Sequence, residues 1–220
     1  MADNERIRQH FQRSISSFDL IYSERKGRFK RFVDNHFRQD IYERYELTLQ
    51  ECKDIGDKRI LDVGCGSGRY SIGLAQYNPA QIVGIDFSKN AIELANKFAQ
   101  DNGISNLCSF INGDFTKYQF DTKFHTTLAI GLFDYIADPV SVISKMRNIT
   151  LEKIIMSFPS KSTYRMAIRK MRYRLMNCPL FMYDKEKLQT ILAESDIQNY
   201  TIRKLYGTDN SGDFFVVAKL

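Results

Sequence analysis

The chain has 220 residues, of which 43% are hydrophobic and 26% are charged. This length favours one domain, and the composition is that of a folded globular protein rather than a collagen-like or disordered chain. The four cysteines follow no CxxC or Cys/His spacing, so we expect reduced thiols in a cytoplasmic compartment, without a disulfide framework or a metal site. The polar N-terminus lacks the apolar core of a secretory signal, and no stretch reaches the roughly 18–20 apolar residues that span a bilayer.

The positive charge is concentrated in one segment. The formal net charge is +6, and residues 161–174 (KSTYRMAIRKMRYR) carry six Lys or Arg and no Asp or Glu, so the other residues sum to zero. Such a cluster indicates one element that faces an anion, and it argues against a surface covered by nucleic acid.

Residues 3–54 show the spacing of helices. Apolar residues that include Phe29, Phe32 and Val33 recur three and four positions apart. We expect residues 1–54 to form an N-terminal helical lid, and residues 55–220 to form a core domain with a basic insert at 159–182.

From Arg59 onward, short apolar strands alternate with helices. Segments typical of strands are RILDVG, QIVGID, LCSFING, TTLAIGL and KIIMSF, and helices are expected to begin at Ser88, Asp138 and Asp184. YTIRKLY and DFFVVAKL have no helix between them, which predicts an antiparallel hairpin at the end of the chain. The pattern predicts an α/β fold, a Rossmann-like open twisted sheet of seven mostly parallel strands with helices on both faces.

A glycine-rich turn follows the first of these strands. Gly64, Gly66 and Gly68 lie between ILDV and a helix that is expected to begin at Arg69. Glycines let a ligand approach the backbone closely, and amides at a helix start bind carboxylate or phosphate groups. The spacing is G-x-G-x-G, so the turn lacks the last glycine of the dinucleotide fingerprint, and the Lys-Ser/Thr pair of a nucleotide P-loop is also absent. A plain strand–helix connection is the alternative reading.

The segment ILDVGCGSGRY resembles the class I S-adenosylmethionine-dependent methyltransferases. Three later segments extend the resemblance in the same order: residues 84–88 (GIDFS), 112–115 (NGDF) and 130–136 (IGLFDYI). The resemblance covers about residues 56–158 and implies S-adenosylmethionine as the cofactor, with S-adenosylhomocysteine as the product.

The resemblance also implies roles for individual residues. Asp62 would organise the loop and hold the cofactor's ammonium through water, while the backbone of residues 64–68 would wrap the methionine portion and the ribose. Asp86 would accept both ribose hydroxyls, Asp114 the adenine amino group, and the Ile130 carbonyl the ammonium. Phe87 and Phe115 would pack on the adenine, with ordinary core packing as their alternative. The expected cofactor-binding residues are Asp62, Gly64, Cys65, Gly66, Gly68, Asp86, Phe87, Asp114, Phe115, Ile130 and Tyr22.

Tyr135 is the catalytic candidate, because it stands where many relatives carry a histidine in the fourth-strand motif. Its phenol would hydrogen-bond the acceptor or shape the sulfonium pocket, although a reference pKa near 10 makes an ordinary tyrosine a poor base. Plain packing is the alternative. Tyr22 resembles the aromatic residue of a lid that closes over the cofactor, and helix packing is its alternative. His125 begins its strand at the end away from the ligand, so we expect it to be structural.

The basic insert lies where this family often carries an element that covers the substrate. Arg165, Arg169 and Arg172 are spaced by four and three residues, which places them on one face if the segment is helical. There they would bind a carboxylate or phosphate of the substrate. The alternatives are an interfacial helix on an anionic membrane and a solvated basic face.

The sequence therefore predicts an enzyme that methylates oxygen or nitrogen of a small-molecule acceptor, for which an anionic metabolite is the leading candidate. An RNA or protein methyltransferase that uses the basic insert is the alternative, with nucleic acid the less favoured partner. A non-catalytic S-adenosylmethionine-binding protein is the alternative of another class. The sequence leaves the oligomeric state open.

Overall fold

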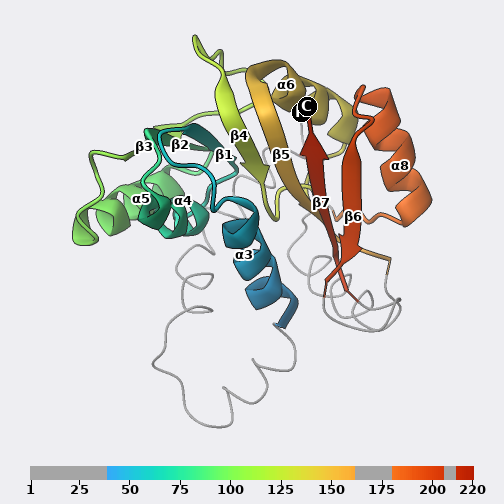
Figure 1. Ribbon diagram of the computed structural model, residues 1–220, viewed down its shortest axis with the longest axis horizontal. Coiled ribbons are helices and arrows are strands. Elements are labelled where there is room, and N and C mark those ends of the chain that lie inside the picture. Colours follow the sequence, from blue (N-terminus) through green and yellow to red (C-terminus); the bar gives the residue numbers. More distant parts are fainter. Residues whose placement is uncertain (1–38, 162–179, 206–211) are drawn as a thin grey trace, which may run out of the picture.

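The computed structural model describes residues 39–161, 180–205 and 212–220. A seven-stranded sheet with the order β3-β2-β1-β4-β5-β7-β6 forms its centre (Figure 1). The strands are β1 (Arg59–Val63), β2 (Gln81–Asp86), β3 (Cys108–Asn112), β4 (Phe124–Ala129), β5 (Thr150–Phe158), β6 (Tyr200–Lys204) and β7 (Phe214–Lys219). The helices within these residues are α3 (Gln39–Glu51), α4 (Arg69–Leu74), η1 (Ala75–Tyr77), α5 (Lys89–Asp101), α6 (Pro139–Ile149) and α8 (Lys185–Glu194).

Strand directions confirm the predicted fold. β1 to β5 run parallel, whereas β7 is antiparallel to both β5 and β6. The chain moves outward from β1 to β2 and β3, then returns to place β4 on the other side of β1. Open α/β sheets bind ligands at the carboxyl ends of the strands beside such a switch point. The topology therefore directs attention to the carboxyl ends of β1 and β4.

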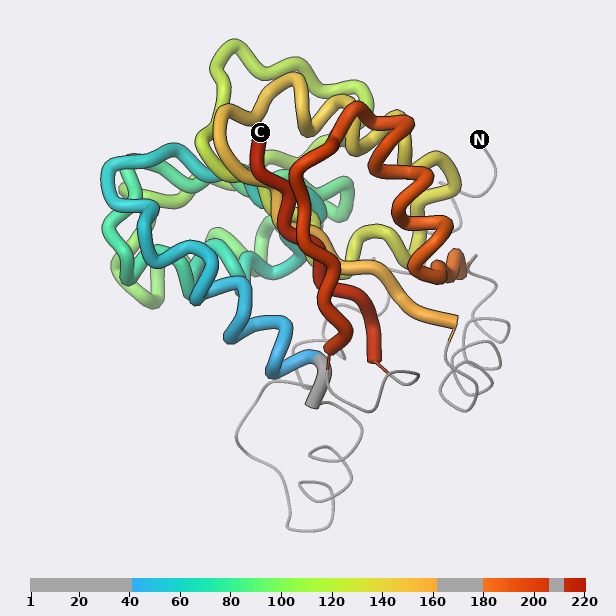
Figure 2. Tube along the Cα trace, turned by 45° about the vertical axis from the view of Figure 1, so that its right-hand side comes forward, coloured from blue at the N-terminus to red at the C-terminus, as the bar shows by residue number. Residues whose placement is uncertain are grey.

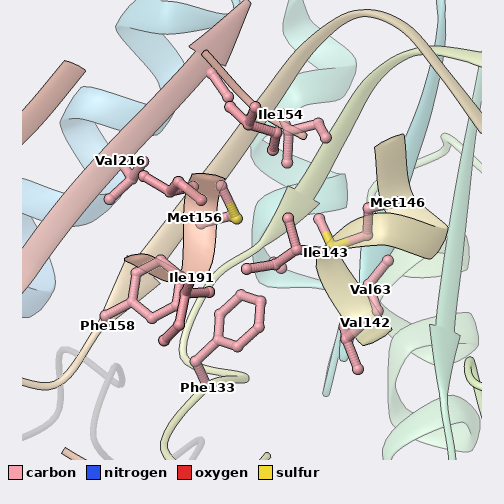
Figure 3. Close-up of a cluster of buried hydrophobic side chains, with 14 of the residues drawn as sticks. Val63, Phe133, Val142, Ile143, Met146, Ile154, Met156, Phe158, Ile191 and Val216 are labelled. Carbon is pink, nitrogen blue, oxygen red and sulfur yellow. The ribbon is translucent and has the colours of Figure 1, made fainter. Parts of the chain in front are cut away.

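Alternating side chains of the strands divide the core into two layers, because successive residues of a strand face opposite sides of the sheet. In β5, Met156 and Phe158 pack with α6 and α8 on one face (Figure 3). Ile155 packs on the other face with residues of α3, α4 and α5. Helices thus cover both faces, as predicted.

Polar side chains define where the helices begin. Ser88 accepts a hydrogen bond from the Ala91 amide at the start of α5, and Asp138 accepts one from the Ser141 amide at the start of α6. Asp184 caps α8 through the Lys187 amide at 2.8 Å. All three predicted helix starts are confirmed.

The strand predicted over TTLAIGL differs in its bounds, since β4 begins at Phe124 and ends at Ala129. It ends there because the amide of Gly131 donates to the side chain of Ser157 rather than to the backbone of a neighbouring strand. The residues after Ala129 consequently leave the sheet at its carboxyl edge. This segment carries several of the predicted site residues.

The helix α3 belongs to the packed body of the protein. Leu49 is buried, and Cys52 and Ile55 just beyond the helix are buried as well, at 0% and 1% exposure. Figures 1 and 2 show α3 lying across the sheet, while the C-terminus follows β7. Residues 1–38 lie outside the described part, so the predicted helical lid and its boundary at residue 54 stay predictions. No helix in the described ranges is long and apolar enough to cross a membrane.

Candidate active site

The glycine turn joins β1 to α4 and is tied to β2. The amides of Gly64 and Cys65 both donate to the Ile85 carbonyl, at 2.8 and 3.2 Å. Gly66 and Gly68 have φ values of +54° and +77°, which side-chain-bearing residues rarely adopt. A Cβ on Gly68 would lie 2.9 Å from the Phe110 ring, whereas a Cβ on Gly66 would meet no atom within 4 Å. Gly68 therefore serves internal packing, while the backbone at Gly66 is open to close approach by a ligand.

Asp86 ends β2 and holds the glycine turn. One oxygen of its carboxylate accepts from the Gly66 amide at 3.0 Å, and the other accepts from the Ser88 amide at 2.8 Å. Burial raises the pKa of Asp86, and the hydrogen bonds from the Ser88 and Gly66 amides oppose that rise. Each oxygen keeps a further lone pair, so the carboxylate retains acceptors for two hydroxyl groups.

Asp62 lies in β1, two residues before Gly64, and is buried at 1% exposure. Its carboxylate accepts from the Ser71 hydroxyl at 2.7 Å, which fastens β1 to α4. Burial raises its pKa to about 6, the Ser71 hydrogen bonds lower it, and the charge of Asp86 adds a smaller upward shift. The predicted organising role agrees with this contact, and the water-mediated contact with an ammonium stays a prediction.

The loop after β3 carries Asp114 and Phe115. Asp114 accepts from both the amide and the hydroxyl of Thr116, at 2.9 and 2.7 Å. Phe115 is 8% exposed and packs with the ring of Phe120 at a centroid distance of 6.3 Å. The side chain of Phe115 thus lies in the core, which was the alternative for it. The adenine contacts of both residues, and of the partly buried Phe87, stay predictions.

The segment after β4 brings Ile130 and Tyr135 to the same edge. Ile130 is buried, and the amide of Tyr135 donates to the Leu132 carbonyl at 3.1 Å, which closes a turn. Tyr135 is partly buried in the middle of this segment. Its phenol therefore lies on the segment that follows β4, beside the switch point, and its catalytic role stays a prediction.

Two residues that the sequence did not single out also lie at this edge. Ser157, near the end of β5, accepts from the Gly131 amide at 2.8 Å and from Nη1 of Arg44 at 3.3 Å. A Cβ on Gly131 would lie 3.7 Å from both terminal nitrogens of Arg44. The Arg44 guanidinium thus lies close to Gly131, the residue that follows Ile130 in the chain. Arg44 reads as one more charge on an amphipathic helix, so the sequence carries no signal that would distinguish it.

The arrangement fits a nucleoside joined to an amino acid. The turn at Gly66 and the carboxylate of Asp86 suit a sugar with two hydroxyls. The Ile130 carbonyl and the Arg44 guanidinium have the polarities that an ammonium and a carboxylate require. These groups come from α3 and from the carboxyl ends of β1, β2 and β4.

The remaining predicted residues fall into two groups. Cys65 is buried in the glycine turn, and burial raises the pKa of its thiol. His125 accepts from the Arg59 amide at 3.0 Å, at the amino end of β4, which agrees with a structural role. Outside the described residues lie Tyr22, Arg165, Arg169 and Arg172. Where the chain is described, no group of three or more His, Cys, Asp or Glu residues is arranged to hold a metal ion.

Comparison with known proteins identifies the family of the chain. A family model described as a methyltransferase domain matches residues 56–196. The human EEF1A lysine methyltransferase 2 is 28% identical over 135 residues, which are 59% of this chain and 57% of that protein. The ubiquinone biosynthesis O-methyltransferase of Actinobacillus pleuropneumoniae is 30% identical over 108 residues, or 47% of this chain and 46% of that protein. This chain spans about half the length of these curated relatives.

Among the similar solved structures is one that matches nearly the whole chain. The magnesium protoporphyrin IX methyltransferase of Synechocystis PCC 6803, crystallised with bound SAH, has a TM-score of 0.81. The match covers 99% of both chains at 18% sequence identity. At this sequence identity, the similarity shows a shared fold and nothing about the substrate.

Proposed function

The chain belongs to the methyltransferase-domain family, and from this premise we propose that it transfers a methyl group from S-adenosylmethionine and releases S-adenosylhomocysteine. The expected membership of class I is confirmed by the family match and by the sheet topology. One observation carries the assignment of the site. The Gly66 amide donates to Asp86, so the turn expected to wrap the methionine portion and the carboxylate expected to bind the ribose are joined.

Bound S-adenosylmethionine supplies a methyl group that its sulfonium already activates. The residues of this chain then have to bind, orient and exclude water. Asp86 holds the ribose through the acceptors that Gly66 and Ser88 leave available, and the open backbone at Gly66 lets the cofactor lie against the turn. Tyr135 places a phenol on the segment after β4, where it hydrogen-bonds the acceptor or lines the path of the methyl group.

The amino-acid part of the cofactor has two binding groups of its own in this proposal. The Ile130 carbonyl accepts from the ammonium, and the Arg44 guanidinium binds the carboxylate. The support is their proximity, since the terminal nitrogens of Arg44 lie 3.7 Å from the Cβ position of Gly131. Recognition of both charges selects an α-amino acid over a simple thioether nucleoside.

Binding and turnover test the cofactor assignment separately. Calorimetry should show one molecule of S-adenosylhomocysteine bound per chain, and cofactor labelled on the methyl group should transfer the label to an extract of small metabolites. Binding without transfer to any fraction would instead favour a non-catalytic cofactor-binding protein. Absence of binding would overturn the proposal.

The acceptor is proposed to be a small anionic molecule methylated on oxygen or nitrogen. The support begins with the charge of residues 161–174. The described residues at both ends of the insert lie together, because Ser160 and Tyr183 form a β-bridge and the Phe181 amide donates to the Asp134 carbonyl at 2.9 Å. The insert therefore leaves and re-enters the fold beside the segment that carries Tyr135.

Neutralising Arg165, Arg169 and Arg172 together to Gln should raise the KM for the acceptor about tenfold or more, since each removes a charge-assisted hydrogen bond. The affinity for S-adenosylhomocysteine should not change. The matched control neutralises three exposed lysines elsewhere, Lys53, Lys89 and Lys97, and should leave both quantities unchanged. An unchanged acceptor KM in the arginine variant would contradict this role.

Among the relatives are enzymes named for macromolecules, so a macromolecular acceptor is the alternative that has to be tested. Binding of an RNA acceptor should weaken steeply and linearly on a log–log plot as salt increases, because counterions are released from the phosphates. A small anion that contacts two or three arginines should show a much shallower dependence. A steep slope with transfer to the RNA fraction would contradict the small-molecule proposal.

A further inference from the structure

Ser157 is a buried hydroxyl in an otherwise apolar part of β5. Its exposure is 1%, and its neighbours Met156 and Phe158 are fully buried. A buried hydroxyl costs free energy unless it forms hydrogen bonds, so its partners explain what the position does. These partners come from two other elements, the segment after β4 and α3.

Both partners are donors. The Gly131 amide donates at 2.8 Å and Nη1 of Arg44 at 3.3 Å, so the two lone pairs of the serine oxygen are used. The side chain of Ser157 therefore links residues that are 26 and 113 positions away in the sequence.

The bond to Gly131 also sets the direction of the carbonyl before it. A peptide unit is planar and trans, so the Gly131 N–H and the Ile130 C=O point in opposite directions. Because the N–H is directed at Ser157, the Ile130 oxygen is directed away from the body of β5. The same hydroxyl limits where the Arg44 guanidinium can lie.

We propose that Ser157 is a positioning residue that aligns the Ile130 carbonyl and the Arg44 guanidinium to receive the ammonium and carboxylate of the cofactor. The inference rests on the proposed function, because it concerns the same cofactor. Its effect is confined to the amino-acid part. The adenosine part depends on Asp86 and the glycine turn, which Ser157 does not contact.

Two ligands separate these effects. S-adenosylhomocysteine carries the amino-acid part, and 5′-methylthioadenosine lacks it. In S157A the affinity for S-adenosylhomocysteine, measured by calorimetry on the full chain, should fall about tenfold or more, while the affinity for 5′-methylthioadenosine stays within about twofold. S157T keeps the hydroxyl and should restore most of the loss.

A matched control lies on the same strand. Thr150 is also a buried hydroxyl of β5, bonded to the Met146 carbonyl at 2.6 Å, but it lies at the opposite end of the strand. T150V should lower stability without changing either affinity. If S157A does not fold, S157C fills the position with a slightly larger thiol that is a weaker acceptor, and it should give the same split between the two ligands.

The outcomes are distinct. An equal loss for both ligands, or no loss for S-adenosylhomocysteine, would overturn the positioning role while leaving the proposed function intact. If the wild-type chain bound neither ligand, the proposed function itself would fail, whatever the behaviour of S157A.

Discussion

Two carboxylates of the site are held by different donors. Asp86 accepts from two backbone amides, whereas Asp62 accepts from both the hydroxyl and the backbone of Ser71. Only proline removes a backbone amide by substitution, so the geometry around Asp86 depends mainly on the path of the chain. Among the described residues, the side-chain hydrogen bond of Asp62 comes from Ser71 alone, so a substitution of that serine removes it.

The raised pKa of Asp62 predicts a pH effect on stability. The folded protein holds the proton up to about pH 6, whereas the unfolded chain releases it near 3.8. The contribution of Asp62 to the free energy of unfolding therefore falls as the pH rises across that window. Asn keeps an acceptor for Ser71 without a charge, so D62N should gain up to about 3 kcal/mol relative to the wild type between pH 4 and 7. Urea unfolding of both proteins at several pH values measures this gain, and a difference that does not change with pH would contradict it.

At the scale of elements, two glycines of the turn between β1 and α4 have different roles. Gly68 immediately precedes α4 and packs against α5 and β3, since a Cβ there would also lie 3.2 Å from the Cβ of Ala95. Gly66 meets no atom of the described protein at that position. The turn therefore packs against the rest of the protein at Gly68 and leaves its backbone accessible at Gly66.

This division predicts two different phenotypes. G68A combines an unfavourable φ with a steric contact and should lower the free energy of unfolding by about 2–3 kcal/mol, whereas G66A carries only the backbone strain, about 1 kcal/mol. G66A should nevertheless bind S-adenosylhomocysteine less well than its stability suggests, because its methyl group occupies the approach to the backbone. Urea unfolding and calorimetry on both variants test this. Greater destabilisation of G66A, with unchanged affinity, would be inconsistent with it.

Elements that follow local rules could be predicted from the sequence. The strands around ILDV and GID, the helix starts at Ser88 and Asp184, and the terminal hairpin all depend on residues near one another in the chain. The contact of Arg44 with Ser157 depends on how α3 crosses the sheet, which no local pattern encodes. The core position of Phe115 also depends on tertiary packing. The local sequence is the same whether the ring faces a ligand or packs on Phe120.

At the scale of the whole molecule, the order of strands brings the site together. The seven strands and their directions follow from alternation, but the return of the chain from β3 to β4 beside β1 does not. That return places residues from α3, β1, β2, β4 and β5 at one edge. The family match shows a methyltransferase domain. In our proposal, the residues around Tyr135 and the insert bind the acceptor.

The central claim is that Asp86 and the glycine turn form one S-adenosylmethionine site. Calorimetric titration of S-adenosylhomocysteine into D86A tests it most directly, with E93A on the exposed side of α5 as the matched acidic control. Loss of two hydrogen bonds to a charged acceptor should raise the Kd about a hundredfold or more in D86A, while E93A should match the wild type. A near-normal Kd in a folded D86A would contradict the account.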